Sequence, residues 1–242
     1  MKISSLFSTL FPVALGLLTT MAASAEAFPS YTPQPRGIPN VRVSGGTRSP
    51  AGSSCISDPQ APQLTSIFPD DDLGYTTDRY PAFQWYMPDN NASYVEFNLY
   101  EVVNEEDGIY ESVYQTTFVP RSTAGIATLQ LSEAAGLAPL SPDNYYYWSV
   151  DVYCSDDLAA VMMADGFVEV LVPEPTLATA LAESDGIDRA AIAAENGLWF
   201  DATRALTDHL TTQPNDRQAL DSWQTLLESI GLENIADAPL LP

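Results

Sequence analysis

The chain has 242 residues, of which 45% are hydrophobic and 10% aromatic, and its nine lysines and arginines against 32 aspartates and glutamates give a formal net charge of −23. This hydrophobic content excludes a disordered chain, and the length suits one large domain or two small ones. Nucleic acids and anionic lipids attract positively charged surfaces, so the acidity of the chain argues against both as partners.

The first 25 residues have the pattern of a secretory signal peptide. Lys2 supplies a positive start, residues 6–21 are mostly apolar, and Ala23-Ser24-Ala25 places small residues where a signal peptidase cleaves. We therefore expect a cleaved signal peptide over residues 1–25 and an exported, periplasmic or extracellular mature protein; an uncleaved anchor is the alternative. No later apolar run approaches the roughly 20 residues that cross a bilayer, so no transmembrane span is expected.

Residues 26–63 are rich in proline, glycine and serine and have no apolar periodicity, which is typical of an extended arm. The arm contains Arg36, Arg42 and Arg48, so it is mildly basic beside a strongly acidic body. We favour an arm that folds back along that body; the alternative is an arm that reaches a separate acidic partner.

Short segments of alternating apolar and polar residues follow the arm. In residues 81–88, Phe83, Trp85 and Met87 would lie on one face of a strand. The predicted strands are residues 81–88, 94–102, 113–119, 127–131, 145–154 and 167–172. Because no helical pattern separates them, they predict an antiparallel β-sandwich of immunoglobulin or fibronectin type over residues 64–173. Residues 140–150 resemble the fibronectin-type turn that leads into a strand with a core tryptophan.

Helical periodicity begins after Pro173 and Pro175. The predicted helices are residues 176–182, 188–196, 198–210 and 216–230. The last two are amphipathic, with apolar stripes formed by Trp199, Ala202, Leu206 and Leu210 and by Leu220, Trp223, Leu227 and Ile230. Residues 174–242 therefore predict a small helical subdomain after the sandwich, and the fold class is α+β.

Two cysteines, Cys55 and Cys154, are present in a chain that is expected to be exported. An even number without a Cys-x-x-Cys spacing predicts one structural disulfide, which would join the arm to the end of the strand at residues 145–154. A redox-active cysteine is the alternative, and it needs a nearby partner and a lowered thiol pKa.

The chain is poor in the residues that most enzymes use. His209 is the only histidine and Lys2 the only lysine, so a Ser-His-Asp triad, a Schiff-base lysine or a histidine-rich zinc site is not available in the mature chain. His209 falls in the last turn of a predicted helix, where a cation interacts favourably with the helix dipole, so we expect it to cap that helix at the surface. We therefore expect that the protein is not an enzyme and that it binds no organic cofactor.

Carboxylates are plentiful and leave two alternatives open. Five acids on or beside the predicted strands are candidates for a glycosidase-like acid–base pair. They are Glu96, Glu101, Glu111, Asp151 and Glu169, and most of them belong to the face that is expected to be solvated. Residues 70–72, 89–91 and 156–157 are oxygen-rich turns of the kind that bind calcium, although aspartate and asparagine also form turns without a metal.

Several short motifs occur in an order that resembles a known family. They are Val43-Ser44-Gly45-Gly46-Thr47-Arg48, residues 81–88, Tyr147-Trp148 leading to Cys154, Gly197-Leu198-Trp199-Phe200-Asp201-Ala202, Trp223 with Leu226-Leu227, and Ile230-Gly231-Leu232. In this order the chain resembles the cyanobacterial secreted family called domain of unknown function 928. It departs mildly from the family pattern at Ser49 and Phe200, where glycine and tyrosine are typical. The resemblance implies a cyanobacterial exported protein and assigns no activity.

The leading hypothesis is an exported, non-enzymatic binding or adaptor protein in which the sandwich is a rigid body and the helices offer an apolar groove or face. Its candidate interaction residues are Trp199, Phe200, Trp223 and Arg48, and its expected partner is another exported or cell-envelope protein.

The alternative is a glycan-binding or carboxylate-based glycan-acting protein that uses tyrosines for stacking: Tyr86, Tyr94, Tyr100, Tyr110, Tyr114, Tyr145, Tyr147 and Tyr153. A calcium-stiffened surface protein is a third possibility. Ligand and oligomeric state stay open.

Overall fold

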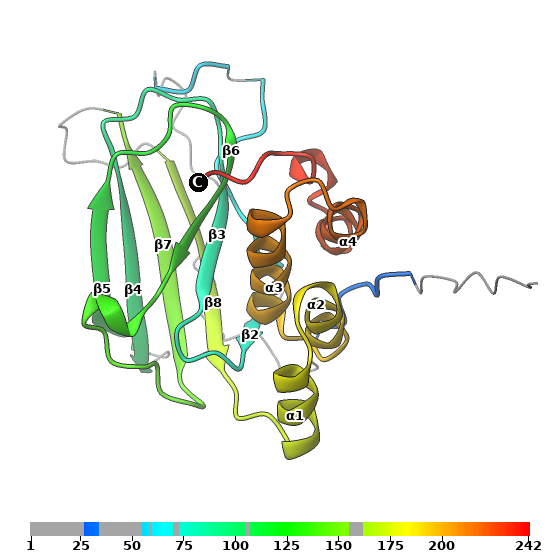
Figure 1. Cartoon of the computed structure of the whole chain (residues 1–242). Helices are drawn as coiled ribbons and strands as arrows, with labels where there is room; N and C mark the ends of the chain where they lie inside the picture. Colours follow the sequence, from blue (N-terminus) through cyan, green and yellow to red (C-terminus); the bar gives the residue numbers. More distant parts are fainter. Residues whose placement is uncertain (1–26, 34–54, 59, 70–72, 105–106, 155–161) are drawn as a thin grey trace, which may run out of the picture.

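A computed structural model describes residues 27–33, 55–58, 60–69, 73–104, 107–154 and 162–242 (Figure 1). The predicted signal peptide and most of the arm, including Arg48, lie outside the described residues. The described part contains two β-sheets and four α-helices, so the predicted α+β class is confirmed. No helix in these ranges is long and apolar enough to cross a membrane.

One sheet has three strands and the other has five. The three-stranded sheet has the order β1-β3-β6, formed by Thr65–Ser66, Ala82–Met87 and Gly125–Gln130. The five-stranded sheet has the order β2-β8-β7-β4-β5, formed by Gly74–Thr76, Met162–Val170, Tyr145–Tyr153, Tyr94–Asn104 and Ile109–Phe118. All six predicted strands are present, and β1 and β2 are additional.

The prediction of a wholly antiparallel arrangement is wrong at one edge, where β2 pairs in parallel with β8. The other pairings within both sheets are antiparallel. Strand β2 has no hairpin partner in the sequence, because the chain continues from it into β3 of the other sheet. Its direction is therefore set by the path of the chain rather than by a tight turn.

The two sheets pack face to face through aromatic side chains. Phe83 of β3 contacts Phe97 of β4 and Trp148 of β7, with ring centroids 5.2 and 5.3 Å apart. These rings belong to the apolar set of each alternating strand, and all three are fully buried. The period-two pattern thus directs one face of each sheet into a shared core.

The helices follow the last strand. They are α1 (Pro175–Glu183), α2 (Gly186–Glu195), α3 (Trp199–Thr212) and α4 (Arg217–Glu228), and the short 3-10 helices η1 (Glu133–Ala135) and η2 (Glu233–Ile235) complete the fold. Asp216 caps α4, because its carboxylate accepts bonds from the backbone N–H groups of Gln218 and Ala219.

Helix α3 packs on both sheets and closes one side of the gap between them. The indole of Trp199 donates to the carbonyl of Ile67 at 2.8 Å, and the Phe200 ring contacts Phe83 at 5.5 Å. One buried cluster accordingly runs from the strands into the helices, across the predicted domain boundary at residue 174. In Figure 1 the helices gather on one side of the strands, next to β2 and β3.

The structure joins Cys55 to Cys154 by a disulfide bond, with Cα atoms 5.3 Å apart and a sequence separation of 99. The described end of the arm also pairs with the turn after β3: Ile56 and Asn90 form an isolated antiparallel bridge, and Asn91 N–H donates to the carbonyl of Cys55 at 2.8 Å. This part of the arm is therefore fixed to the body.

Candidate functional site

The predicted interaction residues of the helices are buried. Trp199 is 0% exposed, and Phe200 and Trp223 are each 2% exposed. Trp199 and Phe200 contribute to the shared core, so their burial argues against both as candidate interaction residues. The apolar stripe of α3 is buried by other parts of the same chain, which the sequence pattern does not distinguish from a partner's surface. Arg48 lies outside the described residues.

Trp223 differs, because it also lines a groove between α3, α4 and residues 236–242. We call this the α4 groove. Its volume is about 720 Å³, and its apolar lining includes Leu210, Leu220, Trp223, Ala238, Pro239 and Leu241. Leu220 is 42% exposed on α4, whereas Trp223 and Leu227 of the same stripe are buried. Part of the predicted apolar face of α4 therefore stays accessible.

Residues 236–242 form one wall of the α4 groove and are held by backbone bonds. Ile126 N–H of β6 donates to the carbonyl of Pro239, and Leu241 N–H donates to the carbonyl of Ile126, both at 2.8 Å. Asp237 also accepts a bond from the side chain of Gln224 on α4. The segment thus connects the edge of the three-stranded sheet to the last helix.

The rim of the α4 groove is acidic. Asp221 and Asp237 are the only charged side chains among the described residues that line it. Two carboxylates beside an apolar lining favour a ligand that is apolar and carries a cation, because opposite charge steers encounter and fixes orientation.

A second polar arrangement lies on the face of the five-stranded sheet that points away from the three-stranded sheet. Asn98 on β4 donates through its amide to Glu96 at 3.2 Å and to Asp151 at 3.1 Å, and Ser149 donates to Asp151 at 2.8 Å. The two carboxylates therefore converge on one amide. Burial raises the pKa of Asp151, and the bonds from Ser149 and Asn98 act in the opposite direction.

Tyrosines surround these carboxylates, and we call the whole arrangement the tyrosine–carboxylate face. Tyr94 and Tyr153 stack with ring centroids 4.4 Å apart, and Tyr100 and Tyr147 stack at 6.4 Å. All four were predicted as candidate stacking residues. The strand register brings them together, since Tyr94 is opposite Tyr153 and Tyr100 is opposite Tyr147 in the β4–β7 ladder.

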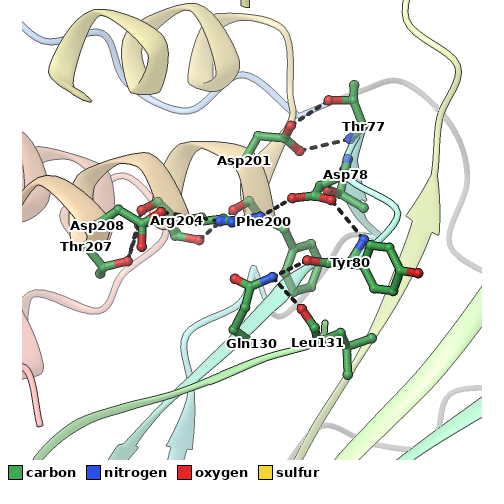
Figure 2. A network of polar contacts seen from close by, with 12 residues as sticks. Thr77, Asp78, Tyr80, Gln130, Leu131, Phe200, Asp201, Arg204, Thr207 and Asp208 are labelled. Carbon is green, nitrogen blue, oxygen red and sulfur yellow. Dashed lines mark hydrogen bonds and ion pairs between the residues drawn. The ribbon is translucent and has the colours of Figure 1, made fainter. Parts of the chain in front are cut away.

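A third polar network connects α3 to the turn after β2 (Figure 2). Asp201 accepts bonds from the backbone N–H and the hydroxyl of Thr77, at 2.9 and 2.6 Å. Arg204 forms ion pairs with Asp78 and Asp208. Burial raises the pKa of Asp201, whereas the bonds from Thr77 and Thr76 lower it. Asp201 belongs to the sequence motif at residues 197–202 but was not predicted as a functional residue.

His209 and the oxygen-rich turn at residues 89–91 take part in local hydrogen bonds, whereas the turns at residues 70–72 and 156–157 lie outside the described residues. His209 lies in the last turn of α3 and contacts Asp216 through Nε2 at 2.9 Å, and this bond lowers the pKa of Asp216. In the oxygen-rich turn at residues 89–91, Asp89 accepts a bond from Ala124 N–H and the Asn90 amide donates to the carbonyl of Arg121. No group of three metal-binding side chains occurs within the part of the chain that the structure covers.

No curated protein matches the chain. The family model of the Domain of Unknown Function (DUF928) matches residues 43–240, which include every strand and helix of the described part of the chain. The chain therefore belongs to the DUF928 family.

Proposed function

We propose that the chain is an exported, non-enzymatic binding or adaptor protein, and that it docks its partner in the α4 groove. The observation that carries this proposal is the apolar groove with an acidic rim between α3, α4 and residues 236–242. The partner is another exported or cell-envelope protein, which inserts an apolar segment carrying a lysine or arginine.

The sequence supports the cellular part of the proposal. The signal-peptide pattern of residues 1–25 favours export, and the family resemblance favours a cyanobacterial source. Amino-terminal sequencing of the native protein tests export, since cleavage after Ala25 leaves Glu26 as the first residue. In this proposal an immunoglobulin- or fibronectin-like sandwich is the rigid body, and residues 174–242 are the helical interaction region.

The chemistry of the groove determines which partner fits. Leu220 exposes an apolar side chain beside Asp221, and Asp237 lies on the opposite wall. An apolar side chain that enters the groove would bury hydrocarbon surface worth about 25 cal/mol per Å². A cation on the same segment would pair with the rim acids at the surface, and salt would weaken that part of the binding.

Photo-crosslinking tests the groove. Leu220 is replaced by p-benzoylphenylalanine in the full chain in its source cell, and Tyr145, which is 37% exposed on β7 and does not line the groove, is replaced in the control. We expect a major adduct with one exported protein at Leu220 that is missing from the control. Asp221→Lys combined with Asp237→Lys should reduce this adduct at least tenfold. The same adducts at both positions, or no effect of charge reversal, would contradict the proposal.

A second candidate function is glycan binding at the tyrosine–carboxylate face. The supporting observation is the convergence of Glu96 and Asp151 on the Asn98 amide beside the stacked pair Tyr94 and Tyr153. Acids and amides bind sugar hydroxyls, and aromatic rings stack on sugar rings. Titration with soluble oligosaccharides from the cell envelope should perturb tyrosine fluorescence, and Tyr94→Ala should abolish the change. No saturable change with any oligosaccharide would remove this candidate.

A further inference from the structure

A pocket lies between the edges of the two sheets, on the side opposite α3. We call it the sheet-edge pocket. Strands β5 and β6 are the edge strands of their sheets, and residues 119–124 connect them. The pocket has a volume of about 280 Å³, and its apolar lining includes Trp85, Met87, Phe118, Val119, Leu129 and Leu241. Whereas Phe200 of α3 closes the gap between the sheets on one side, this side contains an apolar cavity.

The inner wall of the pocket is buried and aromatic. Trp85 is 2% exposed and its ring contacts Phe118 of β5, with centroids 6.2 Å apart. At the mouth, Val119 is 77% exposed. The lining thus grades from a buried aromatic wall to an open apolar rim, which suits the buried tail of a small ligand.

Arg121 is the only charged side chain among the described residues that line the pocket. Its guanidinium has no ion-pair partner in the part of the chain that the structure describes, whereas Arg204 pairs with two aspartates. The loop that carries it is fixed, because the Arg121 carbonyl accepts a bond from the Asn90 amide at 2.9 Å. A held loop therefore presents a cation beside the apolar cavity.

We infer that the sheet-edge pocket binds a small amphipathic anion, with its hydrocarbon tail between the sheets and its carboxylate on Arg121. In a chain with a net charge of −23, anions are repelled in general. A guanidinium without a carboxylate partner offsets that repulsion locally, since it forms paired bonds with a carboxylate. The cavity volume lies near the lower end of the range for ligand sites, about 300 to 1,000 Å³, so the ligand is a short-chain or medium-chain acid.

Calorimetric titration of the mature protein with sodium decanoate tests this assignment. Decanol and decyltrimethylammonium share the tail of decanoate but are neutral and cationic, and they serve as controls. We expect saturable binding of decanoate at a 1:1 ratio, at least tenfold tighter than either control. Arg121→Gln should weaken decanoate binding at least tenfold and leave decanol binding unchanged. The matched control is Arg217→Gln, which alters an exposed arginine on α4 and should leave decanoate binding unchanged.

A second variant tests the location of the tail. Ala127 of β6 lines the pocket, so Ala127→Leu should fill it and weaken the binding of both decanoate and decanol. Circular dichroism shows whether each variant keeps its fold. Equal binding of decanoate and decyltrimethylammonium, or an Arg121→Gln variant that binds decanoate like the original chain, would overturn the inference. Neither Arg121 nor Ala127 lines the α4 groove, so failure here leaves the docking proposal intact.

Discussion

Replacing Phe200 with alanine tests whether α3 is part of the core, because the ring contacts residues of both sheets. Its centroid lies 5.5 Å from that of Phe83 in β3, and its edge lies against Gly74 of β2 in the other sheet. Truncating a core phenylalanine to alanine costs about 3–5 kcal/mol. We expect the upper half of this range, because the cavity would open between a helix and two sheets, whose backbones cannot close it without losing their own hydrogen bonds.

Urea unfolding followed by circular dichroism measures this cost from the midpoint and the slope. Phe200→Leu keeps most of the volume and should lose less than about 1.5 kcal/mol. Val172→Ala is the surface control, since Val172 is 68% exposed, and its change should stay within about 0.5 kcal/mol. A loss of less than about 1 kcal/mol in Phe200→Ala would mean that the ring is not packed between the sheets.

Three further predictions concern contacts distant in sequence. Folding raises the pKa of Asp201, so the contribution of Asp201 to the free energy of unfolding falls as the pH rises from the ordinary to the raised pKa. Lowering the pH from 7 to 4.5 should therefore stabilise the original chain relative to Asp201→Asn, as measured by paired urea titrations. The same difference in unfolding free energy at both pH values would contradict this. Replacing Cys55 and Cys154 with serine should cost about 2–5 kcal/mol and make the thermal midpoint insensitive to reductant. Gly74→Ala should lower the free energy of unfolding by about 1–3 kcal/mol, because the added Cβ would clash with the Phe200 ring. A double-mutant cycle should show a smaller loss when Phe200→Ala is also present.

Local pattern was sufficient to predict the longer elements. Each predicted strand overlaps an observed one, and each predicted helix overlaps one of α1 to α4. Strands β1 and β2 have only two and three residues, so they are too short for an alternating pattern to be recognised in the sequence. A sequence pattern indicates which residues share one face of an element, but not which strand pairs with which. It therefore could not predict the parallel pairing of β2 with β8.

The candidate sites show the same limit. The stripe containing Trp199 predicts an apolar face, but the pattern is identical whether a sheet of the same chain or a partner covers it. The α4 groove depends on residues 236–242, which have no periodicity that would place them beside Trp223. The tyrosine–carboxylate face was closer to prediction, because alternation already separates Glu96 and Tyr94 from the inward residues of β4. Its convergence on Asn98 required the strand register.

The contacts that hold α3 on the sheets determine when the fold can form. Trp199 bonds to Ile67, Gln84 to Thr207 and Thr77 to Asp201, and each pair is separated by more than 120 residues. Contacts of such separation form slowly, since a long loop must close before they contribute. A chain emerging from the ribosome amino terminus first cannot complete its core until residue 207 is available. The side of the core that α3 covers, beside β2 and β3, therefore stays open until the helix has been synthesised.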